Sequence, residues 1–202
     1  MNESRIQEIL RYWFGDLKTD SDLPEDKSKI WFRGGKKTDD FIRKHFQNDI
    51  HSAAQNKLDD WKNAPQGCLA LIILLDQFPR NIYRDFPESF AQDAKALELS
   101  LWGIKRGYDV LLKPIEKSFF YMPLIHSEDR SIQTQSLHYF KHLTEEAPQA
   151  IQAYMKNGYD YAVRHAEIIE RFGRFPHRNE ILGRESTSEE LQFLEGPNSS
   201  FA

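Results

Sequence analysis

The sequence predicts an all-α fold in a single domain. Apolar residues recur three and four positions apart along most of the 202 residues. No stretch alternates cleanly enough between polar and apolar residues to require a strand. Neither a low-complexity segment nor a linker divides the chain. We therefore expect one helical domain over residues 1–196, with a core rich in aromatic rings, and a loose tail over residues 197–202.

Start and stop signals follow one another along the chain. Glycines end several apolar stripes, and prolines or hydroxyl side chains stand where the next helices begin. The apolar run over residues 68–75 belongs to a helix that we expect to end at Phe78–Pro79, because proline lacks a backbone N–H. The expected helices cover residues 6–14, 24–32, 38–61, 68–78, 88–106, 127–143, 148–172 and 186–194.

Two local features of these helices make specific predictions. In the helix over 88–106, apolar residues spaced four, three, four and three apart form the expected core stripe. This stripe consists of Phe90, Ala94, Leu97, Leu101 and Ile104. Side chains that can accept a hydrogen bond from the first helical turn are the expected N-caps. They are Thr38, Ser127 and Ser186, the last in a capping box with Glu189.

Bulk composition excludes several classes of protein. The net charge of −4 argues against general nucleic-acid binding, which needs a broad basic surface. Cys68 is the only cysteine, so no intrachain disulfide can form, and a reducing cytoplasm fits best. The apolar run of eight residues is far shorter than the ~20 residues that cross a bilayer, and the N-terminus is no signal peptide. We therefore expect a cytoplasmic protein without a membrane partner.

The segment over residues 171–184 carries the densest chemical signal. It holds four arginines and one histidine with a single acid, Glu180, among glycine, proline and phenylalanine. Guanidinium groups bind carboxylate or phosphate through a planar fork of donors. The basic residues are Arg171, Arg174, His177, Arg178 and Arg184. They could converge on an anion, or some could instead bind the free carbonyls at the end of the preceding helix, where Gly173 is the expected C′ residue.

Two histidines are candidates for acid–base chemistry. His165 lies on the apolar stripe of the helix over 148–172, where it is either a core residue or faces a polar cavity that tunes its pKa. His126 precedes the expected helix at Ser127, and capping does not explain it. No metal-ligand spacing links His126, Glu128, His165 and His177, so we assign no metal ligand.

A shorter motif, Asp76-Gln77-Phe78-Pro79-Arg80-Asn81, repeats the order of the C-terminal segment: an apolar helix, Phe-Pro, then Arg-Asn. It is either a pseudo-repeat or a shared way to end a helix. Asp76 and Arg80 can also form an ordinary i,i+4 ion pair.

Three motifs of the chain resemble a bacterial family, domain of unknown function 924. They are Leu74–Asn81, Phe120–Pro123 continued by His126-Ser127-Glu128, and Arg171–Asn179 continued by Leu182-Gly183-Arg184. Trp13-Phe14-Gly15, Trp31-Phe32 and Phe90-Ala91-Gln92-Asp93 are similar too. The resemblance implies an array of antiparallel helices with a tetratricopeptide-like fold, although the chain shows no repeat near 34 residues. It implies no activity.

Our leading hypothesis is that the three motifs meet in one pocket that binds a small anionic molecule or a peptide carboxylate. His126 or His165 would act as proton donor or base. The other candidate ligand-binding residues are Asp76, Gln77, Arg80, Asn81, Tyr121, Glu128, Arg171, Arg174, His177, Arg178, Asn179 and Arg184.

The alternatives are a hydrolase, with or without a metal, a protein–protein adaptor with a helical groove, and a purely structural role for the motifs. The sequence identifies no cofactor and no oligomeric state.

Overall fold

The computed structural model describes residues 2–197 and residue 199, and all regular secondary structure in that part of the chain is helical. The α-helices are α1 (Asn2–Phe14), α2 (Glu25–Arg33), α3 (Lys36–Ala54), α4 (Pro65–Ile72), α5 (Phe78–Ile82), α6 (Asp93–Ile104), α7 (Pro114–Ile125), α8 (Arg130–Glu146), α9 (Gln149–Phe172) and α10 (Ser188–Leu194). The predicted all-α class is confirmed. Of the predicted tail, residues 198 and 200–202 lie outside the described residues.

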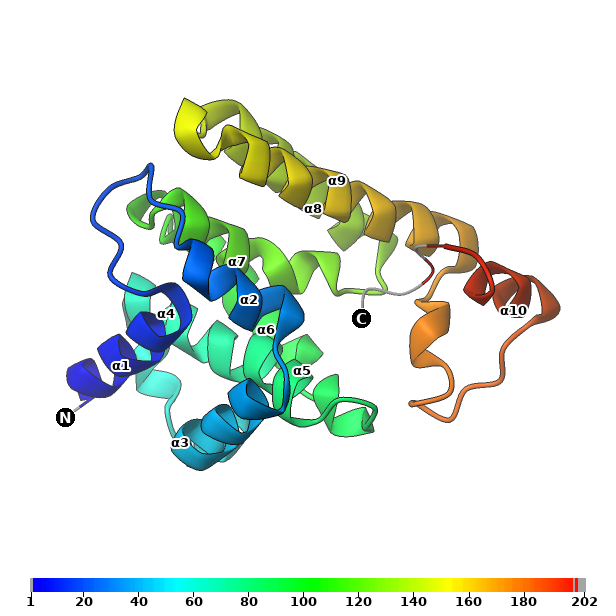
Figure 1. Cartoon of the computed structure of the whole chain (residues 1–202), viewed down its shortest axis with the longest axis horizontal. Coiled ribbons are helices and arrows are strands. Elements are labelled where there is room, and N and C mark those ends of the chain that lie inside the picture. The colour runs from blue at the N-terminus through cyan, green and yellow to red at the C-terminus, as the bar shows by residue number, and fades with distance from the viewer. Residues whose placement is uncertain (1, 198, 200–202) are drawn as a thin grey trace.

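Short turns of other helical types connect these elements. 3-10 turns cover Asp59–Asn63, Pro87–Ser89, Asp109–Leu111 and Pro176–Arg178, and a π turn covers Ile73–Gln77. Figure 1 shows α8 and α9 side by side as a long antiparallel pair, with α7 running beneath them. The chain beyond α9 leaves this pair at the end away from the N-terminus. The tetratricopeptide-like arrangement stays a prediction.

Aromatic rings tie the first helices to α7. Trp13 packs edge-on against Phe78 and Phe119, with ring centroids 5.5 and 5.6 Å apart, and its carbonyl accepts a hydrogen bond from Trp31 Nε1. Trp13, Phe78 and Phe119 are fully buried. Because Phe78 follows the π turn and Phe119 lies in α7, this packing fixes the π turn beside α7.

The predicted end of a helix at Phe78–Pro79 is wrong. The chain continues through the π turn into α5, and the N–H of Phe78 bonds to the carbonyl of Ile73, five residues back. Pro79 then stands in the first turn of α5, where its missing N–H costs nothing. The wider turn places Asp76 and Gln77 inside the protein, at 0% and 8% exposure.

The boundaries of α3 also differ from the prediction. The helix begins at Lys36 with Gly35 as N-cap, so Thr38 is an interior residue. It ends at Ala54 instead of near Trp61. Asn56 has a φ of 62° in the left-handed region, which an α-helix does not allow.

The predicted core stripe of the helix over 88–106 is on the wrong face. Helix α6 begins only at Asp93, and Ala94 is exposed while Leu97 and Leu101 are half-buried. The buried face has small residues because α7 approaches closely: a Cβ on Gly103 would lie 2.3 Å from Phe120 Cζ. The buried residues are Ala96, Leu99, Ser100 and Gly103.

Helix α7 was missed in the sequence, because Pro123 lies inside it. Two expected caps shift by a residue or two. The N-cap of α8 is Asp129, whose carboxylate accepts hydrogen bonds from two backbone N–H groups of the first turn, and the capping box of α10 is Thr187 with Glu190. The predictions for α1, α2 and α9 hold, including Gly173 after α9 with a φ of +69°.

Candidate functional site

A buried carboxylate and a histidine form the centre of the candidate site. Asp76 lies on the π turn and His126 at the end of α7, and His126 Nδ1 is 2.7 Å from Asp76 Oδ1. Gln77 Nε2 donates to the other oxygen of Asp76, and Arg80 Nη1 lies 3.5 Å from Oδ1. Residues 50 positions apart in the sequence are thus joined.

Charge and burial fix the protonation states of this pair. Burial alone would raise the pKa of Asp76, but the charge of Arg80 and the hydrogen bonds from His126 and Gln77 outweigh it and hold the pKa well below its usual value. Burial lowers the pKa of His126, as does the charge of Arg80, while Asp76 opposes this. At neutral pH Asp76 is therefore a carboxylate and His126 a neutral imidazole. Nδ1 of His126 carries the proton that it shares with Asp76, so Nε2 of His126 has the free lone pair.

Two arginines from distant motifs meet at one carboxylate, Asp93, in the first turn of α6. Arg80 donates to both oxygens of Asp93 at 3.0 Å, and Arg178, which lies 85 residues after Asp93, donates at 3.2 Å. The Arg178 guanidinium also stacks between the rings of Phe90 and Phe175, 4.7 and 4.5 Å from their centroids. Burial lowers the pKa of Arg178 to about 10, so it remains charged at neutral pH.

The other two candidate histidines stand beside this centre. The ring of His165 is 6.2 Å from that of His126 and 5.3 Å from that of Phe175, and its Nδ1 lies 2.8 Å from the carbonyl of Tyr161. Burial lowers the pKa of His165 well below its usual value. Burial, and then the charge of Arg178, lowers the pKa of His177 to about 4. Both are neutral at pH 7.

Glu128 connects the start of α8 to the C-terminal segment, defined here as residues 173–194. Its carboxylate accepts two hydrogen bonds from Arg184, at 2.7 and 2.9 Å, and one from the backbone N–H of Phe175 at 2.8 Å. Burial would raise the pKa of Glu128, but these hydrogen bonds lower it. The arrangement holds the segment against the rest of the protein.

The charges of these ionised groups cancel. The site has three cations and three anions, and each cation touches at least one of the anions. They are Arg80, Arg178 and Arg184 on one side and Asp76, Asp93 and Glu128 on the other.

The structure does not bring all predicted arginines together. Arg174 donates to Glu190, which is 2% exposed, and Arg171 pairs with Glu189 on the surface. Neither arginine therefore meets the others at one anion, and Arg184, which pairs with Glu128, does not share Asp93 either. Arg171 and Arg174 join α10, which ends the C-terminal segment, to α9 and to the start of the same segment, because Glu189 and Glu190 lie in the first turn of that helix.

Three further candidates have other partners. Tyr121 donates to Asp109, away from the Asp76–His126 pair. Asn81 donates to the carbonyl of Gln77 and accepts from Arg84, and Asn179 donates to Ser186. Tyr121, Asn81 and Asn179 stabilise the structure around the site but are not at its centre.

Sequence reasoning missed Phe90 and Asp93 as site residues. The stripe of the helix over 88–106 predicts a core position for Phe90, and no pattern in the sequence predicts a role for Asp93. The signal that could have found them was already present: Phe90-Ala91-Gln92-Asp93 is one of the segments by which the chain resembles the family. Two other segments that resemble the family together contain more arginines than their own carboxylates can pair with. An acid in a third such segment is a candidate partner for these arginines.

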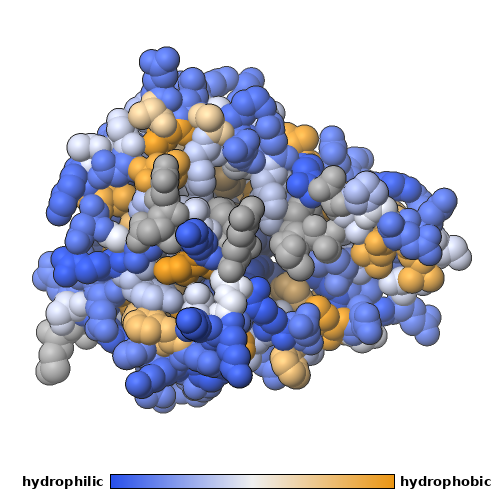
Figure 2. All heavy atoms as spheres, viewed as in Figure 1, coloured by the Kyte–Doolittle hydropathy of each residue, from blue (hydrophilic) through white to orange (hydrophobic). Residues whose placement is uncertain are grey.

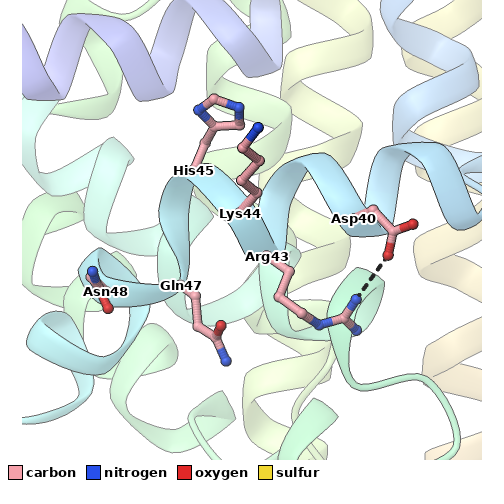
Figure 3. A pocket seen from close by; sticks show the side chains of 6 residues that line it. All are labelled: Asp40, Arg43, Lys44, His45, Gln47 and Asn48. Carbon is pink, nitrogen blue, oxygen red and sulfur yellow. Dashed lines mark hydrogen bonds and ion pairs between the residues drawn. The ribbon is translucent and has the colours of Figure 1, made fainter.

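Two surface hollows lie away from this cluster. One, of about 360 Å³, is lined by Asp40, Arg43, Lys44, His45, Gln47 and Asn48. Figure 3 shows that these side chains leave the single helix α3 in different directions, with Arg43 bound to Asp40. Side chains that diverge cannot hold one small molecule between them.

The second hollow is a groove between α8 and α9, with Leu137, Val163 and Ala166 among its lining residues and Arg130, Glu167 and Glu170 beside them. None of the predicted site residues lines either hollow. On the face shown in Figure 2, hydrophobic residues form small separate groups among hydrophilic ones.

Among residues 2–197 and 199, no three His, Cys, Asp or Glu side chains are grouped so that they could hold a metal ion. Within the same part of the chain, every helix is too short or too polar to span a bilayer.

Comparisons with known proteins point to one family. The family model described as "Bacterial protein of unknown function (DUF924)" matches residues 9–198. A solved structure of a protein of unknown function from Agrobacterium tumefaciens is 32% identical, with a TM-score of 0.81, and the match covers 97% of this chain and 100% of that one. No curated protein matches the chain.

Proposed function

We propose a function for this chain, which belongs to the bacterial DUF924 family, from the geometry of its site. The site binds a small molecule through a carboxylate or phosphate group at Arg80 and Arg178, beside the Asp76–His126 pair. The observation that carries this proposal is the meeting of both guanidinium groups at the carboxylate of Asp93. Asp93 occupies the place that a ligand's anionic group would take.

The charge balance explains how such a ligand would compete. Asp93 is a covalently attached carboxylate whose side chain is 19% exposed, so solvent reaches it. A ligand with two or three acceptor oxygens can make the same forked hydrogen bonds and displace it. Because the cluster is neutral with Asp93 in place, an external anion binds only in exchange for that carboxylate.

The test removes the internal competitor. Asp93→Asn keeps the shape of the side chain but leaves Arg178, 6% exposed, without a charged partner at that position. Without added anion, the melting temperature of Asp93→Asn should fall, because a buried charge has lost its neutralising partner. With inorganic phosphate, the variant should regain more stability than the wild type gains.

The control for this test is Asp160→Asn, which removes an exposed carboxylate on α9 that pairs with Lys156. It should change neither the melting temperature nor the response to phosphate by more than a small amount. If phosphate stabilises Asp93→Asn no more than it stabilises Asp160→Asn, the anion site does not exist.

Acid–base catalysis at His126 is a second candidate, favoured by the contact between Asp76 and His126 Nδ1. A carboxylate that fixes the tautomer of a neutral histidine leaves the opposite nitrogen ready to take a proton from water or substrate. A screen of activated esters and phosphoesters tests it. Activity should be lost in His126→Gln and kept in His138→Gln, which changes an exposed histidine of α8. Equal activity in both variants would exclude His126 as the base.

A further inference from the structure

The C-terminal segment (residues 173–194) is attached to the rest of the protein in two different ways. Its apolar contact is with α9, where Phe175 packs with Ile168 and Ile169 in a small core separate from the main one. Its contacts across the site are made by charged groups: Arg178 with Asp93, and Glu128 with Arg184 and the Phe175 N–H. The segment therefore belongs to α9 by packing and to the helical body by ion pairs.

The chain can turn where the segment leaves α9. Gly173 adopts a φ of +69°, and a Cβ added there would meet nothing within 4 Å. A glycine without packed neighbours can change its backbone angles at low cost. In Figure 1 the chain leaves the end of α9 here and extends beyond the other helices as far as α10.

The segment shields the centre of the site. His165 is 2% and His126 is 8% exposed. The segment places the ring of Phe175 beside His165, whose own ring neighbours His126, and His177 and Arg178 lie against Phe175. Little of either histidine is therefore open to a substrate or ligand while the segment lies in this position.

We propose that residues 173–194 are a hinged cover over the Asp76–His126 pair, which turns at Gly173 and is held closed by Glu128 and Asp93. The identity of the ligand that enters rests on the proposed function, but the proposed movement of the segment does not. Opening breaks hydrogen-bonded ion pairs, whose groups water solvates once they separate, and it also separates Phe175, which lies beyond Gly173, from the small core that it forms with Ile168 and Ile169. Segments held in this way open at lower cost than helices packed in the main core.

Chemical modification of the histidines measures this opening without any ligand. Diethylpyrocarbonate modifies neutral imidazole, and tryptic peptides separate His126, His165 and His138 for quantification by mass spectrometry. His138 is exposed on α8 and gives the rate of an unshielded histidine in the same sample. In the wild type His126 and His165 should react much more slowly than His138.

The variant that loosens the cover is Glu128→Gln, which removes the charge that binds Arg184. Losing a charge-assisted pair of this kind should increase the modification rate of His126 and His165 by about tenfold. Glu180→Gln, which changes an exposed glutamate in the same segment, should leave both rates as they are. The rate of His138 should be the same in all three proteins.

Two results would overturn the cover. One is a wild-type His126 that reacts as fast as His138, and the other is a Glu128→Gln variant with the wild-type rate. Should Glu128→Gln fail to fold by circular dichroism, Arg184→Gln breaks the same pair from the segment's side and carries the same expectation. Because no phosphate is added, the result stands whether or not Asp93→Asn binds an anion.

Discussion

The substitution Asp76→Asn is a direct test of the charge assigned to the centre of the site. The Asp76 carboxylate accepts hydrogen bonds from His126 Nδ1 at 2.7 Å and from Gln77 Nε2, with Arg80 Nη1 3.5 Å away. Asparagine keeps one acceptor oxygen, and its NH₂ group faces a donor. The variant therefore loses the charge and at least one of these two hydrogen bonds.

The expected loss follows from these contacts. A hydrogen bond to a charged group contributes about 1.5–3 kcal/mol and one between neutral groups about 1 kcal/mol. Losing one charged bond and weakening the other gives a decrease of about 2–4 kcal/mol in the free energy of unfolding at pH 7. Urea denaturation followed by circular dichroism measures it, with Asp160→Asn as the exposed control.

The pH dependence of this loss has a defined sign. Because the pKa of Asp76 is lower in the folded protein than the unfolded value of about 3.9, its contribution to stability is present above that pH and is lost as the pH falls. Below the unfolded pKa, titration of Asp76 should lower the free energy of unfolding of the wild type by up to about 1.4 kcal/mol per pH unit. Asp76→Asn lacks the group and should show no such loss. The difference in the free energy of unfolding between the wild type and Asp76→Asn should therefore be about 1 kcal/mol smaller at pH 3 than at pH 7.

Two results would refute this reasoning. A loss below about 1 kcal/mol at pH 7 would mean that the Asp76 charge is not held by its neighbours. A gap that widens between pH 7 and pH 3 would mean that the folded pKa of Asp76 lies above the unfolded one.

Two further predictions concern packing in the core. Gly103→Ala should lower the free energy of unfolding in urea by about 1–2 kcal/mol, because a contact of 2.3 Å with Phe120 Cζ outweighs the better helix propensity of alanine; a variant more stable than the wild type would contradict the close approach of α6 and α7. Cys68 is fully buried, and burial raises its pKa to about 12, so a thiol reagent such as Ellman's should react with it at pH 8 only after denaturation. Rapid reaction of the folded protein would show that this part of the core opens readily.

Local sequence patterns were enough to predict features that depend on residues of one helix or one short motif. The stripe that includes His165 and the glycine after it predicted both the burial of this histidine and the end of α9 at Phe172. The ion pair of Asp76 with Arg80 was also predictable, because both residues lie in one short motif. Such features depend on residues within a few turns of one another.

Features that depend on distant segments could not be predicted in this way. The buried face of α6 is set by how closely Phe120 of α7 approaches Gly103, so the more apolar face containing Leu97 and Leu101 stays half-buried. A π turn adds a residue to a helical repeat and has no simple sequence signal. Arg178 and Asp93 are 85 residues apart in the sequence, and only the folded structure shows that Asp93 is the carboxylate partner of this arginine.

The cancellation of charge in the site also affects how a charged solute would arrive. Paired cations and anions a few ångströms apart produce a field that decays quickly, so little of it extends into solvent. An incoming anion would find the site by unguided diffusion, and its association rate would vary little with ionic strength. Selectivity would then arise after arrival, when the solute exchanges places with Asp93.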